Sequence, residues 1–410
     1  MFRNVALFRD RGFATFWVAT LAYSAAQWME RVITGWLALG LGGDAFAVGV
    51  VLAARLVPFV VFGLVAGSVA DRFSRRWILI TVAIAAALVN LSLAAFLARD
   101  QVTLVLLIVI GFVTGVIQVF DLTSRGAFAV DLVGREHAAP AIALNAVGLR
   151  FFGAVGAFAG GIVIPTLGSA WGYVVVAGLF LLSAALVVVV RPTARTARAD
   201  VLTEPLAGMV AGTARLIWRN PAVRMVVIAS VASELFGYSH QAALPSLARD
   251  ALAIGPEGLG ALTAAASIGA TISVVVLSVI PATTARPPLL TLTLAIWGVT
   301  LAGLGLTSAP WLALAFMLGV GACASAIDVL QQTIAQMAVP DRERGRATGV
   351  WVFSIGLNVI GLLQVGAIVS ILGPAVALVG NGLGAITAAI VIATLNPRYR
   401  WRGRPSIVGA

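Results

Sequence analysis

Long apolar runs separated by short polar loops are the main pattern of this chain. Each run holds ~20 residues, the length at which an α-helix crosses the hydrocarbon core of a bilayer. We count twelve such runs, centred on Trp28, Val60, Ala87, Ile110, Gly153, Leu181, Leu235, Ile268, Ile296, Gly321, Ile360 and Ala388. The pattern predicts an all-α membrane protein whose twelve transmembrane helices nearly exhaust the 410 residues.

The composition agrees with a chain that lies almost entirely in lipid. Apolar residues make up 60% of the sequence and charged residues only 10%, and the mean hydropathy is +1.04. A soluble domain needs a charged surface, which this composition does not supply. We therefore expect the lipid bilayer to surround the chain.

All 27 basic residues are arginines, and their positions predict the orientation of the chain. Most lie at the amino end, in alternate loops and in the carboxyl tail, whereas only Arg99 and Arg249 fall in the opposite loops. Because arginine-rich loops stay in the cytoplasm, both termini are predicted to be cytoplasmic, in the inner membrane of a bacterium. The same distribution explains the net charge of +11 without a nucleic-acid partner.

The chain contains two related halves. With an offset of 207 residues, Asp121 falls on Asp328 and the segment 132–137 falls on 339–344. Paired six-helix halves hold a substrate site between them, near the middle of the membrane. We predict an amino-terminal six-helix bundle at 1–190, a cytoplasmic linker at 191–221, a carboxyl-terminal six-helix bundle at 222–396 and a cytoplasmic tail at 397–410.

A charged segment interrupts the apolar pattern between the second and third runs. Its characteristic residues are Gly67, Asp71, Arg72, Arg75 and Arg76, with Ser74 before the closing pair of arginines. This spacing resembles the signature of the major facilitator superfamily, which usually has glycine at the position of Ser74. The resemblance implies the fold of that superfamily, two pseudo-symmetric bundles of six transmembrane helices, and a protein that works as a monomer.

The resemblance also implies roles for these charges as a gate at the cytoplasmic side. Arg75 is expected to pair with Asp121 at the end of the fourth helix. Asp71 is expected to lie against the amino end of the eleventh helix, where the helix dipole favours an anion. Together the two contacts would latch the outward-facing state. The alternative is that these charges only fix the topology.

Polar residues in the first and seventh runs recur every three or four positions, so each set shares one face of a helix. Charged residues at membrane depth are costly and usually face a cavity or a partner. We therefore predict that both faces line a substrate cavity. The sets are Tyr23, Gln27, Glu30, Arg31 and Thr34 in the first run, and Ser230, Glu234, Tyr238 and Gln241 in the seventh.

Glu30 and Glu234 are the candidate proton carriers. Burial and a nearby guanidinium shift the pKa of a carboxyl group in opposite directions, so such a group can load and release a proton. The alternative is a buried acid that is permanently paired with arginine, as Glu30 would be with Arg31, Arg55 or Arg150. The sequence leaves both interpretations open for each acid.

Three glycines in the fifth run, Gly156, Gly160 and Gly161, resemble the glycine motif of superfamily antiporters, although Ala157 replaces its proline. Small residues also let membrane helices pack closely, which is the alternative explanation. A second antiporter feature, an arginine in the middle of the fourth helix, is absent from 103–120. Arg55 and Arg150 are candidates for that role.

The chain offers no energy source other than an ion gradient. It contains no lysine, and the lysine of a P-loop is needed to bind ATP phosphates. Two histidines and one cysteine provide no clustered metal ligands, so we expect no metal and no cofactor besides the proton gradient. An intramembrane enzyme would need a nucleophile with a base, or metal ligands, and neither pattern is evident.

Three further segments, 7–13, Pro58 and 339–346, resemble the superfamily branch that contains enterobactin and macrolide exporters. The resemblance implies a secondary active transporter that exports a small amphipathic molecule, such as a drug, a siderophore or another secondary metabolite, by proton antiport with alternating access. Alternatives within the same fold are an importer or facilitator of a polar metabolite and a lysophospholipid translocator. A non-transporting membrane protein is disfavoured because it would not need Glu30 and Glu234.

Overall fold

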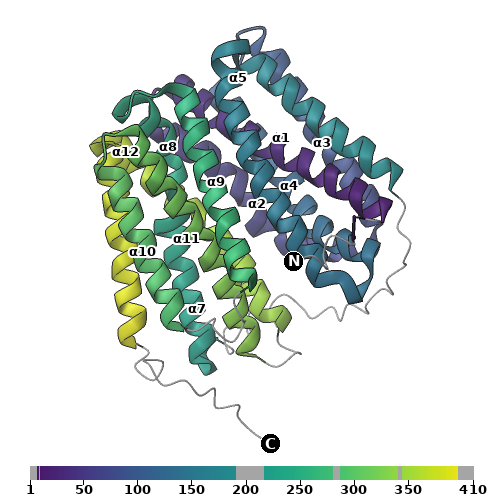
Figure 1. Cartoon of the computed structure of the whole chain (residues 1–410). Helices are drawn as coiled ribbons and strands as arrows, with labels where there is room; N and C mark the ends of the chain where they lie inside the picture. The colour runs from purple at the N-terminus through teal and green to yellow at the C-terminus, as the bar shows by residue number, and fades with distance from the viewer. Residues whose placement is uncertain (1–6, 9, 191–216, 280–286, 340–343, 396–410) are drawn as a thin grey trace, which may run out of the picture.

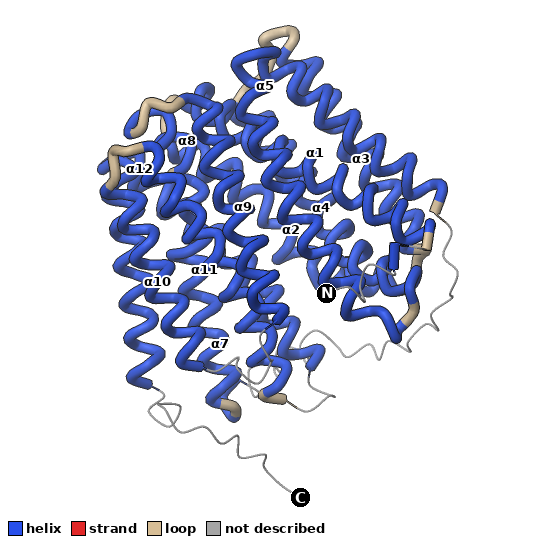
Figure 2. The backbone as a smooth tube through the Cα atoms, viewed as in Figure 1, coloured by secondary structure: helices blue, strands red, loops and turns tan. Residues whose placement is uncertain are grey.

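The computed structural model describes residues 7–8, 10–190, 217–279, 287–339 and 344–395, without the side chains of 63–72, 135, 139, 336 and 344–353. All regular structure in these residues is helical (Figure 2). This description leaves out most of the predicted linker at 191–221 and the predicted tail at 397–410. It also leaves out the side chains of the predicted gate residues Gly67, Asp71 and Arg72.

The first half of the chain forms five long helices, which make six spans because the fifth is broken. They are α1 (Arg11–Gly42), α2 (Ala45–Arg72), α3 (Arg75–Leu97), α4 (Leu104–Val133) and α5 (Ala138–Val189), with a short 3-10 turn at Arg135–His137 before α5. Gly168 interrupts α5 with φ 82° and ψ 160°, a backbone conformation that only glycine adopts without strain. The chain therefore reverses at Gly168 and crosses the membrane again.

The second half repeats this arrangement with one difference, in its first span. Its long helices are α9 (Gly255–Val279), α10 (Pro287–Leu306), α11 (Pro310–Met337) and α12 (Arg344–Leu395), and Gly373 breaks α12 with φ 85° and ψ 166°. The seventh span is discontinuous. It consists of α7 (Pro221–Ala232), the π-helical turn η3 (Ser233–Gly237), the 3-10 turn η4 (Tyr238–Ala242), α8 (Leu244–Ser246) and the π-helical turn η5 (Leu247–Ala251).

Nine segments of the described residues are long and apolar enough to cross a membrane. Two of them, Pro140–Val189 and Ser354–Leu395, contain the breaks at Gly168 and Gly373 and so provide two crossings each. The 32-residue helix α1, with its polar residues, is a further crossing outside that set. These findings are consistent with the twelve predicted spans.

The two halves lie side by side, with the purple-to-blue helices of the first beside the green-to-yellow helices of the second (Figure 1). Because successive spans run in opposite directions, α1, α3 and α5 begin at one end of the molecule, which we call the Arg75 end. The breaks at Gly168 and Gly373 lie at the other end, which we call the Gly168 end. Across the boundary, α2 packs against α12 and α5 packs against α9.

The halves are in close contact towards the Gly168 end. A methyl group at Gly161 of α5 would lie only 2.7 Å from the carbonyl oxygen of Pro256 in α9. A methyl group at Gly49 of α2 would lie 2.6 Å from the carbonyl oxygen of Leu362 in α12. Both helix pairs are thus in backbone contact, and any larger residue at these glycines would hold them apart.

We expect Gly161→Val to separate the two halves at the Gly168 end, because the added methyl groups collide with backbone atoms that cannot rotate away. Spin labels at Leu167 and Ala253, both exposed at that end, should move several ångström apart in a chain whose Cys323 has been replaced by serine. Gly178→Val on the same helix is the matched control, since nothing lies within 4 Å of a Cβ there. An unchanged label distance in Gly161→Val would contradict the packing described here.

Candidate functional site

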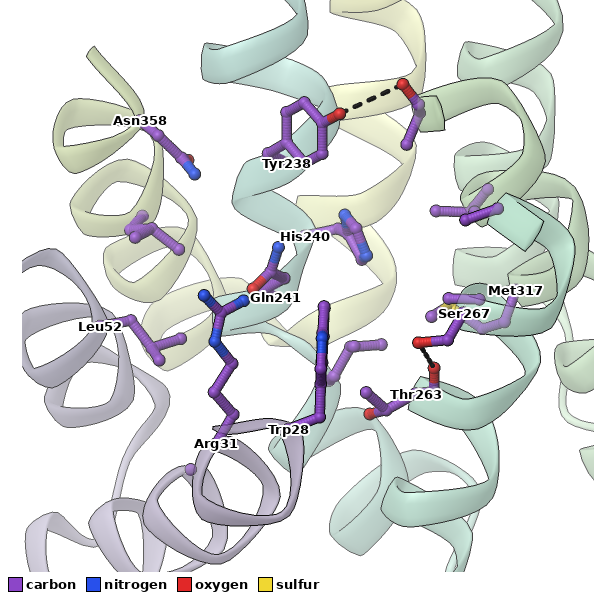
Figure 3. A pocket seen from close by; sticks show the side chains of 18 of the residues that line it. Trp28, Arg31, Leu52, Tyr238, His240, Gln241, Thr263, Ser267, Met317 and Asn358 are labelled. Carbon is purple, nitrogen blue, oxygen red and sulfur yellow. Dashed lines mark hydrogen bonds between the residues drawn. The ribbon is translucent and has the colours of Figure 1, made fainter. Parts of the chain in front are cut away.

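A cavity of about 370 Å³ lies between the two halves, near the middle of the spans (Figure 3). The first half contributes residues of α1, α2 and α5, and the second half contributes residues of the seventh span, α9, α11 and α12. Most of the lining is apolar, with leucine, valine and methionine side chains such as Leu52, Leu56, Met317 and Val320. The polar and charged lining residues are Arg31, Arg55, Arg150, Glu234, Tyr238, His240, Gln241, Thr263, Ser267, Asp328 and Asn358.

One ion pair crosses the cavity from the first half to the second. Nη2 of Arg150 in α5 lies 3.9 Å from Oδ2 of Asp328 in α11, and both side chains are partly exposed to the cavity. Glu234 of η3 lies close enough to Asp328 for their charges to interact, and it is 6% exposed. One guanidinium therefore faces two carboxyl groups, which leaves a net negative charge unless one carboxyl group carries a proton.

A second arginine enters the cavity from α1. The guanidinium of Arg31 stacks over the indole ring of Trp28, with its central carbon 4.7 Å from the ring centroid. Figure 3 shows the Arg31 side chain reaching from α1 into the space between the helices. Stacking on an indole ring is favourable and holds the guanidinium plane in one orientation.

The third arginine is neutralised by a buried acid. Nη1 of Arg55 lies 3.0 Å from Oε2 of Glu30, and Nε of Arg55 donates to the side-chain oxygen of Gln118 at 3.1 Å. The side chains of Arg55 and Glu30 are only 7% and 4% exposed. Glu30 lies behind Arg55 and is not among the lining residues, so this pair joins α1, α2 and α4 within the first half.

Side chains of α11 and α12 form hydrogen bonds with serines of the discontinuous seventh span. Gln331 of α11 accepts a hydrogen bond from Ser230 and donates one to Ser233, at 3.0 and 3.3 Å. Asn381 of α12 donates to the hydroxyl of Ser239 at 2.8 Å. Single π turns inside helices are frequent at functional sites, and here they place Glu234 at the cavity wall.

Two other residues of this span are also fixed by backbone contacts. The hydroxyl of Tyr238 donates to the carbonyl oxygen of Ala324 at 3.1 Å, and its ring packs edge-on against Trp297. Nδ1 of His240 lies 2.6 Å from the carbonyl oxygen of Gly237. Tyr238 and His240 therefore present fixed surfaces to the cavity.

Of the nine residues of the first and seventh runs that were predicted to line the cavity, four do so and five do not. Those that do are Arg31, Glu234, Tyr238 and Gln241, together with the candidate arginines Arg55 and Arg150, whereas Tyr23, Gln27, Glu30, Thr34 and Ser230 are absent from its wall. The prediction that one stripe of α1 faces the cavity therefore holds only for Arg31. The stripe faces the interior of the first half, where Tyr23 packs against Phe180 and Thr34 bonds to the hydroxyl of Tyr173 at 2.9 Å.

The predicted pairing of Arg75 with Asp121 is absent from this structure. Asp121 pairs with Arg125 one helical turn later on α4, and Arg125 also donates to Thr20 at 3.1 Å. Arg75 begins α3 at the Arg75 end and pairs with Asp131 at 2.8 Å, because Asp131 lies almost three turns closer to that end than Asp121 does. The neighbouring Arg76 donates to backbone carbonyl groups at the end of α5.

The glycine motif of α5 serves two helix contacts. A methyl group at Gly156 would collide with the backbone of Ala25, and one at Gly160 would lie 3.0 Å from the carbonyl oxygen of Met29, so both face α1. Gly161 faces α9, as described above. The break of α5 lies at Gly168, beyond the motif, and the motif itself is helical.

Asp328 is a site residue that was not predicted from the sequence, where it is notable only as the repeat partner of Asp121. An acid in the middle of an otherwise apolar span is nevertheless itself the signal of a functional residue. His240, Thr263, Ser267 and Asn358 were not among the predicted cavity residues, although the spacing of four between Thr263 and Ser267 is that of residues on one face of a helix. Among the described residues, no three His, Cys, Asp or Glu side chains are grouped as metal ligands.

Comparison of the sequence with known proteins gives a family and two kinds of relative. The profile of the family described as transmembrane secretion effector matches residues 3–400. The enterobactin exporter EntS of Salmonella typhimurium is 24% identical over 363 residues, which cover 85% of this chain and 83% of the exporter. The multidrug efflux pump Tap of Mycolicibacterium fortuitum is 28% identical over 349 residues, which cover 81% of this chain and 82% of the pump.

Solved structures of transporters share the fold at low sequence identity. The nucleoside transporter NupG superposes with a TM-score of 0.73 at 12% identity, covering 95% of this chain and 100% of that one. A bacterial homologue of the lysosomal transporter Spinster, in an inward-facing and unoccupied conformation, gives a TM-score of 0.71 at 14% identity, covering 95% and 98%. The predicted fold class, an all-α membrane protein with the major facilitator fold, is confirmed.

Proposed function

This chain belongs to the transmembrane secretion effector family of the major facilitator superfamily, and we propose that it exports a small amphipathic molecule by proton antiport. It is a multi-pass membrane transporter of the efflux and secretion type, and not an enzyme. The proposal adds the coupling ion, the class of substrate and the location in a bacterial inner membrane. Its exported compound would be a drug, a siderophore or another secondary metabolite.

The observation that carries the proposal is the cavity with two acids and one bridging arginine between the halves. Its apolar lining suits the body of an amphipathic molecule, because desolvation of apolar surface favours binding. Its carboxyl groups provide a place for a proton at membrane depth. An amphipathic substrate and a proton can thus be held in one cavity.

A proton on Glu234 or Asp328 would change the contact between the halves. With both carboxyl groups ionised, Asp328 attracts Arg150 across the cavity. Protonation of Asp328 removes that attraction, whereas protonation of Glu234 removes the repulsion between the two carboxyl groups and lets Asp328 stay ionised. Each protonation state therefore favours a different separation of the halves, which is the requirement for coupling a proton to alternating access.

The closed Gly168 end limits the state of this transporter under the proposed orientation. If the arginine-rich Arg75 end is cytoplasmic, the backbone contacts of Gly49 and Gly161 close the outer side. The structure is then not outward-facing, so the contacts that would latch the outward-facing state are not expected to form. The separation of Arg75 from Asp121 agrees with that assignment.

Everted membrane vesicles test direction and coupling together. Vesicles from cells that express the chain should accumulate iron-free enterobactin when respiration acidifies their interior, and nigericin should abolish this accumulation. Vesicles without the chain are the control. Accumulation that persists in the presence of nigericin would refute proton coupling. Uptake only by right-side-out vesicles would support an importer and refute export.

A further inference from the structure

Arg31 is the one cavity arginine that makes no ion pair with the described residues. Arg55 is neutralised by Glu30 at 3.0 Å, and Arg150 faces Asp328 at 3.9 Å. In the described part of the chain, the guanidinium of Arg31 makes neither an ion pair nor a hydrogen bond, and its buried Nε is without a hydrogen-bond partner. It stacks instead on the indole ring of Trp28, with its central carbon 4.7 Å from the ring centroid.

An unpartnered guanidinium at membrane depth is unfavourable. Charged side chains in this region normally pair or face water, because the medium solvates them poorly. Arg31 nevertheless sits on α1 at the wall of the cavity, held by an indole ring instead of an acid. The arrangement keeps the planar N–H donors of the Arg31 guanidinium available to a molecule that enters the cavity.

We propose that Arg31 binds the acidic group of the exported molecule, which is therefore an amphipathic anion. The group is a carboxylate or an equivalent planar oxyanion, because a guanidinium donates two parallel hydrogen bonds to such groups. This inference rests on the proposed function, since it takes the cavity to be the substrate site, and it narrows the substrate class.

The rest of the cavity accommodates the apolar body of such an anion. Leu52 and Leu56 of α2 lie on the same half as Arg31, and Met317 and Val320 of α11 lie opposite. The acids Glu234 and Asp328 belong to the second half, so the substrate anion and the proton are held on opposite walls. Neither would need to displace the other from a shared side chain.

Calorimetric titration of the purified protein in detergent with 2-naphthoate and 2-naphthamide tests this inference. The two probes have the same rings and differ in charge. Wild type should bind the carboxylate at least about tenfold more tightly than the amide, the effect of one charge-assisted contact. Arg31→Gln should remove this preference and leave amide binding unchanged, while Arg31→Lys should retain part of it. Arg249→Gln, which lies outside the cavity, should behave as wild type.

Thermal unfolding separates binding from folding in the same samples. Arg31→Gln should unfold at the same temperature as the wild type or higher, because it removes a charge that makes no ion pair. Equal affinity of wild type for the two probes, including no binding of either, would overturn the inference, as would a preference that survives Arg31→Gln. A lower unfolding temperature with both affinities lost would show Arg31 to be structural and would overturn it as well.

The titration needs no gradient, so its outcome is independent of proton coupling. If vesicle transport fails but the anion preference is present and depends on Arg31, the result supports the anion site and refutes the antiport mechanism. If transport is proton-driven but wild type shows no preference for the carboxylate, only the anion site falls.

Discussion

Asp328→Asn is expected to reduce proton-driven export to the level of protein-free liposomes, while the protein still folds and binds its substrate. Asparagine has the shape of aspartate, but it carries no charge and cannot take up a proton. The separation of the halves would then no longer respond to pH. The measurement is export of a labelled compound from reconstituted liposomes after an imposed pH jump, with equilibrium binding of the same compound measured in detergent.

Two variants identify the proton carrier and control for removal of an acid. Glu234→Gln should also abolish proton-driven export if the two carboxyl groups share one proton, and it should leave export partly active if Asp328 alone carries it. Asp250→Asn is the matched control, because Asp250 pairs with its neighbour Arg249 at 2.7 Å, away from the cavity. Proton-driven export at the wild-type rate by Asp328→Asn would refute the role given to the Arg150–Asp328 pair.

Glu30→Gln is expected to destabilise the protein by about 3–5 kcal/mol, because it leaves Arg55 buried without its charge partner. The pair Glu30–Arg55 is 3.0 Å apart and almost fully buried, and Gln118 supplies only one neutral hydrogen bond to Arg55. The double variant Glu30→Leu with Arg55→Leu should recover most of the lost stability, since removing both charges removes both desolvation costs. Unfolding in increasing concentrations of a denaturing detergent measures these differences.

The same variants decide between the two interpretations of Glu30. If Glu30 is a structural partner of Arg55, the double variant should still respond to a proton gradient, although its affinity for substrate can change because Arg55 lines the cavity. A stable double variant that binds substrate but ignores the gradient would make Glu30 a proton carrier. A single variant Glu30→Gln as stable as wild type would show that the ion pair does not contribute to folding.

The spans were predictable from the sequence because the thickness of a bilayer fixes their length. The arginines then indicated which loops share a side, and the signature around Arg75 indicated the superfamily. The discontinuity of the seventh span was not predicted. Its causes are tertiary contacts, such as Gln331 with Ser230 and Ser233, which no local pattern reveals.

The cavity was predicted less well, because periodicity identifies a face of a helix but not the direction in which it points. Tyr23 and Glu30 are seven residues apart and do share a face of α1, but that face packs inside the first half. Arg31 follows Glu30 by about 100° around the helix, and this rotation brings it to the cavity with Trp28. The spacing of three between Trp28 and Arg31 was visible in the sequence, yet only the packing of α1 shows its meaning.

The discontinuous seventh span makes the two halves mechanically unequal. Its counterpart α1 is one uninterrupted helix of 32 residues, so a tilt at one end of α1 must be transmitted to the other end. In the seventh span, the change from α to π to 3-10 turns between Ala232 and Ala242 interrupts the regular hydrogen-bond ladder, and bends concentrate at such points. The segment that begins at Pro221 can therefore swing while α8, which contacts α1 and α2, stays docked against the first half. One end of the transporter can thus begin to move before the contacts at the opposite end have been broken.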